Sequence, residues 1–257
     1  MRFAFSNAEC RPSALREAHL DSLPEPQIHH MERLASSAQI VLIVSHGETV
    51  GYVGVNKECV VEFYLTDAAL PWRSDAFYAA AEHTGARSAL VKSFDALTLS
   101  TIAEREVKAR VVGVNFMTFD ESTFVPRPEI TARSAERSDA SSVREIAADL
   151  YEDAAEIDHH IAARELLMFE SGATLVGCGF VTRIRPNRNA FDIGMAVAPG
   201  FRRRGIGEYI VRHLRRHCVT TLDGRPIAGC AMENIASRRT LEKSGFISHH
   251  SLMELSW

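Results

Sequence analysis

The chain has 257 residues, of which 46% are hydrophobic and 24% are charged, and this composition excludes a disordered or fibrous protein. At roughly 150 residues per domain, the length predicts one large domain or two small ones. The 29 Lys and Arg residues against 33 Asp and Glu residues give a net charge of −4, which disfavours a globally basic nucleic-acid-binding protein.

Other classes are disfavoured by features that the sequence lacks. Residues 1–7 have no apolar core of a secretory signal, and no apolar run approaches the roughly 18 residues that a membrane span needs. Adjacent histidines at 29–30, 159–160 and 249–250 point apart, so we predict no metal site. The five cysteines are scattered without a C-x-x-C pair, which favours reduced thiols and a cytoplasmic protein; they are Cys10, Cys59, Cys178, Cys218 and Cys230.

In chain order, the first block contains a predicted β-hairpin at residues 41–55, with its turn at His46-Gly47. The second block repeats this design at residues 166–181, so that Val50-Gly51 corresponds to Val176-Gly177. Each hairpin is followed by an apolar strand and then by a helical pattern. These similarities suggest an internal repeat.

A connector separates the two blocks at residues 120–129. Pro126 and Pro128 favour extended backbone there and exclude a helix. We therefore predict two domains, residues 1–125 and residues 126–257, each of a normal size for a small domain.

The second block alternates strands and helices. Its predicted order is a strand, a helix at about residues 140–151, the hairpin, a third strand, a helix at about 205–217, a strand at 226–232, a short helix at 236–244 and a final strand at 247–255. This order predicts an α+β architecture.

The most informative segment joins the third strand of this block to its long helix. It contains Arg202, Arg203, Arg204, Gly205 and Gly207. The first amides of a helix have no backbone partners, glycines allow an anion to approach, and arginines match phosphate oxygens. This turn therefore predicts a pyrophosphate-binding site. Three later arginines, at 212, 215 and 216, are expected to complement the C-terminal end of the helix dipole instead.

Two motifs in this block resemble the GCN5-related N-acetyltransferase (GNAT) superfamily. Arg202-x-x-Gly205-x-Gly207 is similar to its acetyl-CoA signature, and the segment from Asn234-x-x-Ser237 to Gly245-Phe246 is similar to its later conserved segment. The resemblance covers roughly residues 130–257. It implies an acetyl-CoA co-substrate without a metal, and two GNAT-like domains, each with a mixed, mostly antiparallel sheet flanked by helices.

The resemblance also implies roles for individual residues. Met195 and Val197 would bind the pantetheine arm, and the Met195 amide would help to polarise the thioester carbonyl. Asn234 would hydrogen-bond the arm. The pyrophosphate would be held by Arg202, Arg203, Arg204, Gly205, Ile206 and Gly207.

The resemblance does not by itself assign the catalytic residues, because Leu241 stands where many members have a proton-donating Tyr. In lacking this Tyr, the chain resembles the ribosomal-protein N-acetyltransferase branch, where a Ser in the Asn-x-x-Ser segment is a proposed proton donor. Ser237 is therefore the candidate general acid, and its alternative role is helix capping. Asp192 and Glu233 are equal candidates for the base, and a water chain is a further alternative. The remaining acidic candidates, expected to be solvated, are Glu152, Asp153 and Glu156.

In the first block, residues 70–75 correspond to the arginine and glycine turn. This stretch has no glycine, and Asp75 offsets its one arginine, Arg73, so an anion site cannot form there. Residues 93–97 resemble the start of the Asn234 helix. We expect a degenerate GNAT-like domain that has no cofactor and shapes the acceptor pocket; an unrelated α+β domain is the alternative.

The function predicted from these features is acetyl transfer from acetyl-CoA to a primary amine of a small metabolite, an amino acid or a peptide. The alternative is a non-catalytic acyl-CoA-binding sensor. A nucleic-acid patch over residues 201–217 is disfavoured by the acidic balance of the chain, and no membrane partner is predicted. The acceptor, the acyl chain length and the choice between monomer and homodimer stay open.

Overall fold

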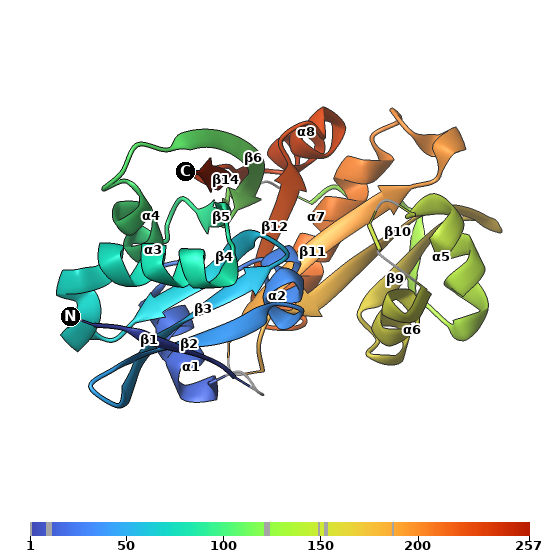
Figure 1. Cartoon of the computed structure of the whole chain (residues 1–257). Coiled ribbons are helices and arrows are strands. Elements are labelled where there is room, and N and C mark those ends of the chain that lie inside the picture. Colours follow the sequence, from blue (N-terminus) through green and yellow to red (C-terminus); the bar gives the residue numbers. More distant parts are fainter. Residues whose placement is uncertain (1, 9–11, 121–123, 149, 152–153, 187) are drawn as a thin grey trace. The chain divides into compact units, whose positions relative to one another are not determined.

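The computed structural model describes all residues except 1, 9–11, 121–123, 149, 152–153 and 187. The chain divides into two compact units (Figure 1). Unit 1 comprises Met1–Val114, Ala231–Glu233 and His250–Trp257, and unit 2 comprises Asn115–Cys230 and Asn234–His249. No helix among the described residues is both long and apolar enough to cross a membrane.

Unit 1 contains a mixed sheet with the strand order β1-β2-β3-β4-β5-β14-β6. Its strands are β1 (Ala4–Asn7), β2 (Gln39–Ser45), β3 (Glu48–Asn56), β4 (Cys59–Leu65), β5 (Ser88–Lys92), β14 (His250–Ser256) and β6 (Lys108–Phe116), whose last two residues belong to unit 2. Its helices are α1 (Ser13–Ser22), α2 (His29–Ser36), η1 (Asp67–Trp72), α3 (Arg73–Thr84) and α4 (Ala96–Ile102).

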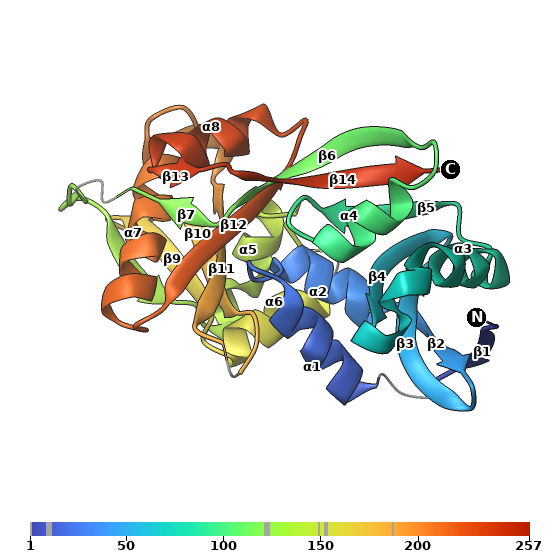
Figure 2. The same ribbon diagram turned by 90° about the vertical axis from the view of Figure 1, so that its left-hand side faces the viewer.

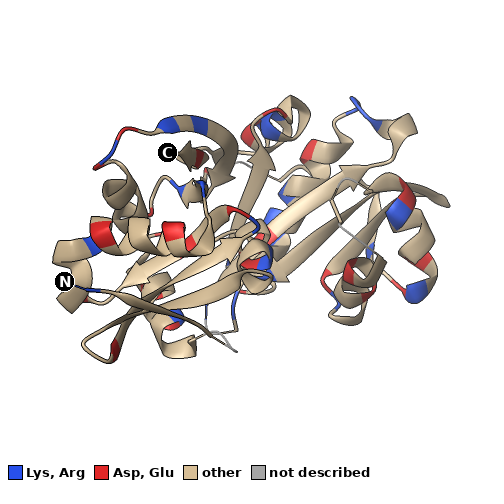
Figure 3. Ribbon diagram, in the orientation of Figure 1, with Lys and Arg blue, Asp and Glu red and all other residues tan. Residues whose placement is uncertain are grey.

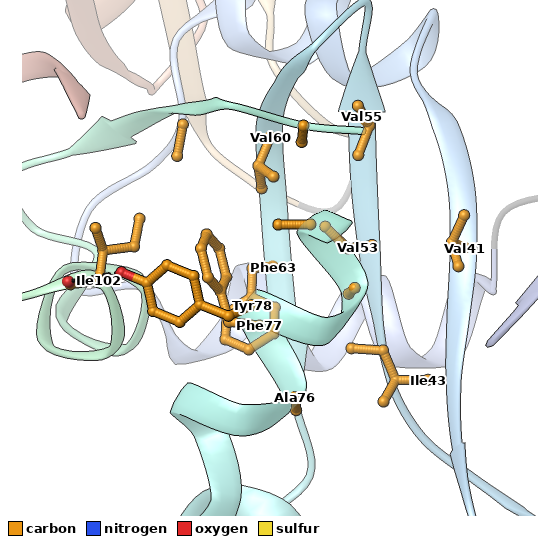
Figure 4. Packing of buried hydrophobic residues seen from close by; sticks show 14 of the residues in the cluster. Val41, Ile43, Val53, Val55, Val60, Phe63, Ala76, Phe77, Tyr78 and Ile102 are labelled. Atoms are coloured by element: carbon orange, nitrogen blue, oxygen red, sulfur yellow. Dashed lines mark hydrogen bonds between the residues drawn. The ribbon is translucent and has the colours of Figure 1, made fainter. Parts of the chain in front are cut away.

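The core of unit 1 forms between this sheet and α3. Alternation along the strands puts Val41 and Ile43 of β2 on the same face, where both are fully buried. Phe63 of β4 meets Phe77 of α3 edge to face, with 5.1 Å between the ring centroids (Figure 4). The apolar hairpin predicted at residues 41–55 is therefore confirmed as a core element.

Unit 2 contains a sheet with the order β12-β11-β10-β9-β8 and a separate β13-β7 pair. Its strands are β7 (Thr118–Phe119), β8 (Thr131–Ser134), β9 (Leu166–Ser171), β10 (Thr174–Arg183), β11 (Ala190–Val197), β13 (Phe246–Ile247) and β12 (Arg225–Ala231), whose last residue belongs to unit 1. Its helices are η2 (Arg137–Asp139), α5 (Ala140–Ile146), α6 (Ala154–Ala162), η3 (Pro199–Phe201), α7 (Ile206–Thr220) and α8 (Ile235–Lys243).

The helix predicted at residues 140–151 is too long, because α5 ends at Ile146 and a second helix, α6, follows. The amide of Leu150 donates to Ala147 in a turn after the helix. Ala147 is nevertheless buried, and Leu150 packs against the same core cluster. The spacing of the apolar residues therefore predicted correctly which side chains face the core, but it did not predict where the helix ends.

The predicted final strand at residues 247–255 is also wrong, because it consists of two strands in different units. β13 pairs with β7 in unit 2, whereas β14 pairs antiparallel with β5 in unit 1, from Leu252 opposite Lys92 to Ser256 opposite Ser88 (Figure 2). The first compact unit thus takes in a strand from the end of the sequence, and the division into domains at 125/126 stays a prediction. Pro126 and Pro128 interrupt regular structure locally, so the sequence indicates a boundary there. The pairing of β14 with the distant β5 has no counterpart in the neighbouring sequence and could not be predicted from it.

The register of the sheets supports the internal repeat. Gly51 lies opposite Leu65, and Gly177 lies opposite Val197. The amide of Thr66 donates to Val50 at 2.8 Å, and that of Ala198 donates to Val176 at 3.0 Å. A Cβ atom at Gly51 would lie 2.2 Å from a backbone oxygen of the neighbouring strand, and one at Gly177 would lie 2.6 Å from such an oxygen. Both glycines are required by the same close approach.

Each unit also has a parallel strand pair that separates partway along. The recorded pairing of β4 with β5 covers Cys59 and Val60, although β4 continues to Leu65. The recorded pairing of β11 with β12 ends at Asp192 opposite Ile227, although β11 continues to Val197. The carboxyl-terminal halves of these strands are therefore splayed within each unit.

Candidate cofactor site

The turn before α7 presents a run of unpaired backbone amides. The amide of Arg202 donates to the carbonyl of Pro199, and the next backbone amide that donates to a carbonyl is that of Tyr209, to Gly205 at 3.1 Å. Within the described chain, the six amides from Arg203 to Glu208 therefore donate no backbone hydrogen bond. They stand at the positive end of a 15-residue helix, an arrangement that could hold an anion.

Gly205 is the N-cap of α7 and has φ 76°, a left-handed conformation that glycine adopts without strain. Its Cα also lies against an arginine, since a Cβ atom built there would be 2.9 Å from Nη2 of Arg127. Glycine at this position is thus favoured by both conformation and space.

Four guanidinium groups surround the turn without a carboxylate partner among the described residues. Arg202, Arg203 and Arg204 are exposed, and Arg127 is half-buried. Figure 3 marks the Lys and Arg positions of the ribbon in blue. Nε of Arg202 donates to the carbonyl of Val197 at 3.1 Å, and the Arg204 guanidinium lies 5.6 Å from the centroid of the Phe201 ring. Their charge is available to an anionic ligand.

The predicted strand residues lie next to this turn. A Cβ atom at Gly207 would lie 3.2 Å from Cε of Met195 and 3.4 Å from Cγ2 of Val197, so both side chains face the first turn of α7. Ile206 is 7% exposed and belongs to the core. It can therefore contribute only its backbone amide to a ligand.

The backbone of Met195 points into the splayed region. The bond from Ala198 to Val176 makes Gly177 and Val197 a non-hydrogen-bonded antiparallel pair. By alternation, the N–H and C=O groups of Met195 point away from β10, toward the side where pairing with β12 has ended. An extended ligand there could hydrogen-bond the strand edge.

Asn234, not Ser237, caps α8. Oδ1 of Asn234 accepts a hydrogen bond from the Ser237 amide at 3.0 Å, which leaves Nδ2 for other partners. The Ser237 hydroxyl instead hydrogen-bonds the thiol of Cys230 at the end of β12. Burial raises the pKa of Cys230, so the thiol is protonated at neutral pH.

The two candidate bases have different environments. Asp192 is 5% exposed on β11, opposite Thr182, and alternation places its side chain on the face opposite those of Met195 and Val197. Glu233 is exposed and belongs to unit 1. Glu156 is half-buried in α6, and Glu152 and Asp153 lie outside the described residues.

The sequence interpretation missed a buried polar cluster beside Asp192. Nδ1 of His160 lies 2.8 Å from Oε2 of Glu165, and the Thr182 hydroxyl donates to the same oxygen at 3.0 Å. Burial alone would raise the pKa of Glu165, but these hydrogen bonds lower it below its usual value. His160 is 2% exposed. The sequence interpretation assigned a surface or packing role to both histidines of the 159–160 pair and did not predict the hydrogen bond between His160 and Glu165.

Tyr151 was also missed. Its ring centroid lies 6.3 Å from that of Phe180, whose ring covers Gly194 of β11. Its hydroxyl is buried without a hydrogen-bond partner among the described residues, and burial raises its pKa. Tyr151 is therefore a protonated donor on the same face of the sheet as Gly194. Its position after a turn gave no sequence signal.

Unit 1 repeats the cap but not the anion site. Oδ1 of Asp95 caps α4 by accepting from the Thr98 amide at 3.1 Å, as Asn234 does for Ser237. In the turn before α3, however, Pro71 has no amide hydrogen, and Arg73 forms an ion pair with Glu104. The absence of an anion site in this half stays a prediction.

The splayed strands of unit 1 carry a buried polar cluster. Nζ of Lys92, at the end of β5, donates to Gln27 at 2.7 Å, and Gln27 donates to Glu62 of β4 at 3.4 Å. Arg16 also donates to Glu62, at 3.0 Å. All of these side chains except that of Arg16 are at least 98% buried.

Comparison with known proteins gives matches in both halves. Residues 11–119 match the description "Acetyltransferase (GNAT) domain", and residues 131–246 match "Acetyltransferase (GNAT) family". No curated protein sequence matches the chain.

Among solved structures, the fold is similar to that of an acetyltransferase from the GNAT family from Colwellia psychrerythraea, with 16% identity, 99% of both chains covered and a TM-score of 0.86. It is also similar to a tandem GNAT protein from the clavulanic acid biosynthesis pathway, with 12% identity, 100% and 98% coverage and a TM-score of 0.64. A GCN5-related N-acetyltransferase from Sphaerobacter thermophilus has 14% identity, 99% and 95% coverage and a TM-score of 0.60.

Proposed function

Because the chain belongs to the GNAT acetyltransferase superfamily, with two of its domains in tandem, we propose that it transfers an acetyl group from acetyl-CoA to a primary amine. The observation that carries this proposal is the run of six unpaired amides before α7, beside four arginines without carboxylate partners. These groups suit the diphosphate of the coenzyme. Unit 2 is the proposed cofactor domain, and unit 1 is proposed to bind none.

In the proposed reaction, the acceptor amine attacks the thioester carbonyl, the C–S bond breaks and the coenzyme leaves as a thiol. The Met195 amide, which points toward the splayed strands, donates to the developing oxyanion. Ser237 gives a proton to the leaving thiolate, and Asp192, Glu233 or a water chain takes the proton from the amine. We propose that the acceptor is a small metabolite, an amino acid or a peptide. We also propose that the protein acts in the cytoplasm.

The alternative function is a non-catalytic acyl-CoA-binding sensor. It is favoured by Leu241, which is buried on α8 where many family members have a proton-donating Tyr. A panel of amines separates the two functions. Release of coenzyme thiol with any amine supports the transferase, whereas binding of acetyl-CoA without release supports the sensor.

The cofactor site is tested by Gly205→Glu, with Gly200→Glu as its control. Glutamate at 205 adds a strained side chain and a negative charge at the turn, whereas a Cβ atom at Gly200 has nothing within 4 Å. We expect calorimetry to show about one acetyl-CoA per wild-type chain, binding close to that of the wild type in Gly200→Glu, and none in Gly205→Glu. Wild-type affinity in Gly205→Glu would contradict the proposal.

A further inference from the structure

The part of the connector from residue 124 to residue 129 is anchored along α7. The ring centroid of Phe124 lies 5.6 Å from that of Tyr209 and 6.0 Å from that of His213. The Tyr209 hydroxyl hydrogen-bonds the backbone of Arg127, and the Ile130 amide donates to the Arg127 carbonyl at 2.9 Å. The backbone of Arg127 is therefore held beside the first turns of the helix.

The Arg127 side chain reaches the anion site from this anchored position. Nη1 and Nη2 each lie 3.4 Å from the carbonyl oxygen of Arg204, in a two-donor contact. Nη2 also lies against Gly205, 2.9 Å from the position of a Cβ atom there. The side chain is half-buried and has no carboxylate partner among the described residues.

This contact sets the direction of one amide in the site. The peptide bond from Arg204 to Gly205 is trans, so its C=O and N–H groups point in opposite directions. Because Arg127 holds the carbonyl, the Gly205 N–H points away from the guanidinium. Rotation of this peptide would instead turn a carbonyl oxygen toward the anion, which would repel it.

We infer that Arg127 is a positioning residue for the diphosphate, which orients the Arg204–Gly205 peptide and adds positive charge beside it. The inference rests on the proposed function of unit 2. It assigns part of the cofactor site to the connector, outside the Arg202-x-x-Gly205-x-Gly207 motif. It also predicts that Arg127 affects only acetyl donors that carry the diphosphate.

The experiment uses the full chain and two acetyl donors. Acetyl-CoA carries the diphosphate, whereas S-acetylpantetheine lacks it. For Arg127→Ala we expect the KM for acetyl-CoA to rise about tenfold with kcat within twofold of the wild-type value, and kcat/KM for S-acetylpantetheine to stay unchanged. Arg127→Lys should recover about half of the loss on a logarithmic scale, because it keeps the charge but not the two-donor geometry. Arg137→Ala, at an exposed arginine of η2, should match the wild type.

An unchanged KM for acetyl-CoA in Arg127→Ala would overturn the inference. Equal losses with both donors would also overturn it, because they would indicate a general structural defect, which thermal unfolding would confirm. These results would leave the proposed function standing. If the wild type neither binds acetyl-CoA nor transfers acetyl from either donor, the proposed function fails, and the role of Arg127 fails with it.

Discussion

At Ser237, the backbone and the side chain have separate partners. Its amide donates to the capping oxygen of Asn234, and its hydroxyl hydrogen-bonds the Cys230 thiol. The alternative role expected for this serine, helix capping, therefore belongs to Asn234. Substitution by alanine removes the hydroxyl and leaves the cap in place, so the proposed chemical role can be tested separately from helix stability.

We predict that Ser237→Ala lowers kcat about 100-fold, as expected for the loss of a general acid, while the Kd for acetyl-CoA and the thermal midpoint stay at wild-type values. Ser237→Thr keeps a hydroxyl and serves as the conservative control. Steady-state kinetics and calorimetry measure the two effects. If Ser237→Ala retains the wild-type kcat, another group supplies the proton, and Tyr151 is the next residue to change.

Among the elements, the two splayed strand pairs differ in what their ends carry. In unit 2 the end of β11 lies beside the anion-binding turn. In unit 1 the buried cluster that includes Lys92 and Glu62 is extended by Asp95, whose Oδ2 lies 3.7 Å from Nζ of Lys92 and 3.8 Å from Nε2 of His19. Ionic side chains in unit 1 thus occupy strands equivalent to those proposed to bind the cofactor in unit 2.

The pKa of Asp95 makes this cluster sensitive to acid. Burial alone would raise the pKa, but His19, Lys92 and the Thr98 amide lower it to about 2. Because the folded-state pKa lies below the unfolded value, the ionised carboxylate stabilises unit 1 above about pH 4, and this stability is lost as the pH falls toward 2.

We predict that the wild type loses about 1 kcal/mol more unfolding free energy between pH 6 and pH 3 than Asp95→Asn does. Asparagine keeps the α4 cap but has no carboxylate to protonate. Urea unfolding at the two pH values measures the difference, with Asp75→Asn, at an exposed position, as the control. Equal losses in the wild type and Asp95→Asn would contradict the assigned role.

For the molecule as a whole, the last strand of the chain completes the first unit. β14 pairs with β5, and the amide of Ser93 donates to the carbonyl of Ser251 at 2.8 Å. The ring of Trp257 packs edge to face on Phe77 at 5.3 Å, measured between ring centroids. A cut at the predicted boundary of 125/126 would therefore remove a strand from unit 1.

Deletion of residues 250–257 should destabilise unit 1 severely, because it removes β14, two buried leucines and the Trp257 contact. We expect a loss of at least 3 kcal/mol, from the leucines alone, and aggregation through the exposed edge of β5. Trp257→Ala, which keeps β14, should show a smaller loss. Thermal unfolding and size-exclusion chromatography measure the outcome, and a truncated chain with wild-type unfolding would contradict this assignment.

The sequence by itself determined the features that depend on a few neighbouring residues. The arginine and glycine turn before α7 and the short helix predicted at residues 236–244 follow from backbone preferences and hydrogen bonds that span only a few positions. The repeat of Val50-Gly51 as Val176-Gly177 was also visible in the sequence, and in the structure each glycine meets the strand that follows its hairpin.

The tertiary structure alone decided which distant residues become partners. Arg16 meets Glu62 across 46 positions, Arg127 meets Arg204 across 77, and Ser251 of β14 meets Ser93, next to β5, across 158. His160 and Glu165 are close in sequence, but they meet because the backbone turns back at Arg164, which has φ 58°. Such contacts depend on burial and strand pairing over the whole fold, and no local pattern encodes them.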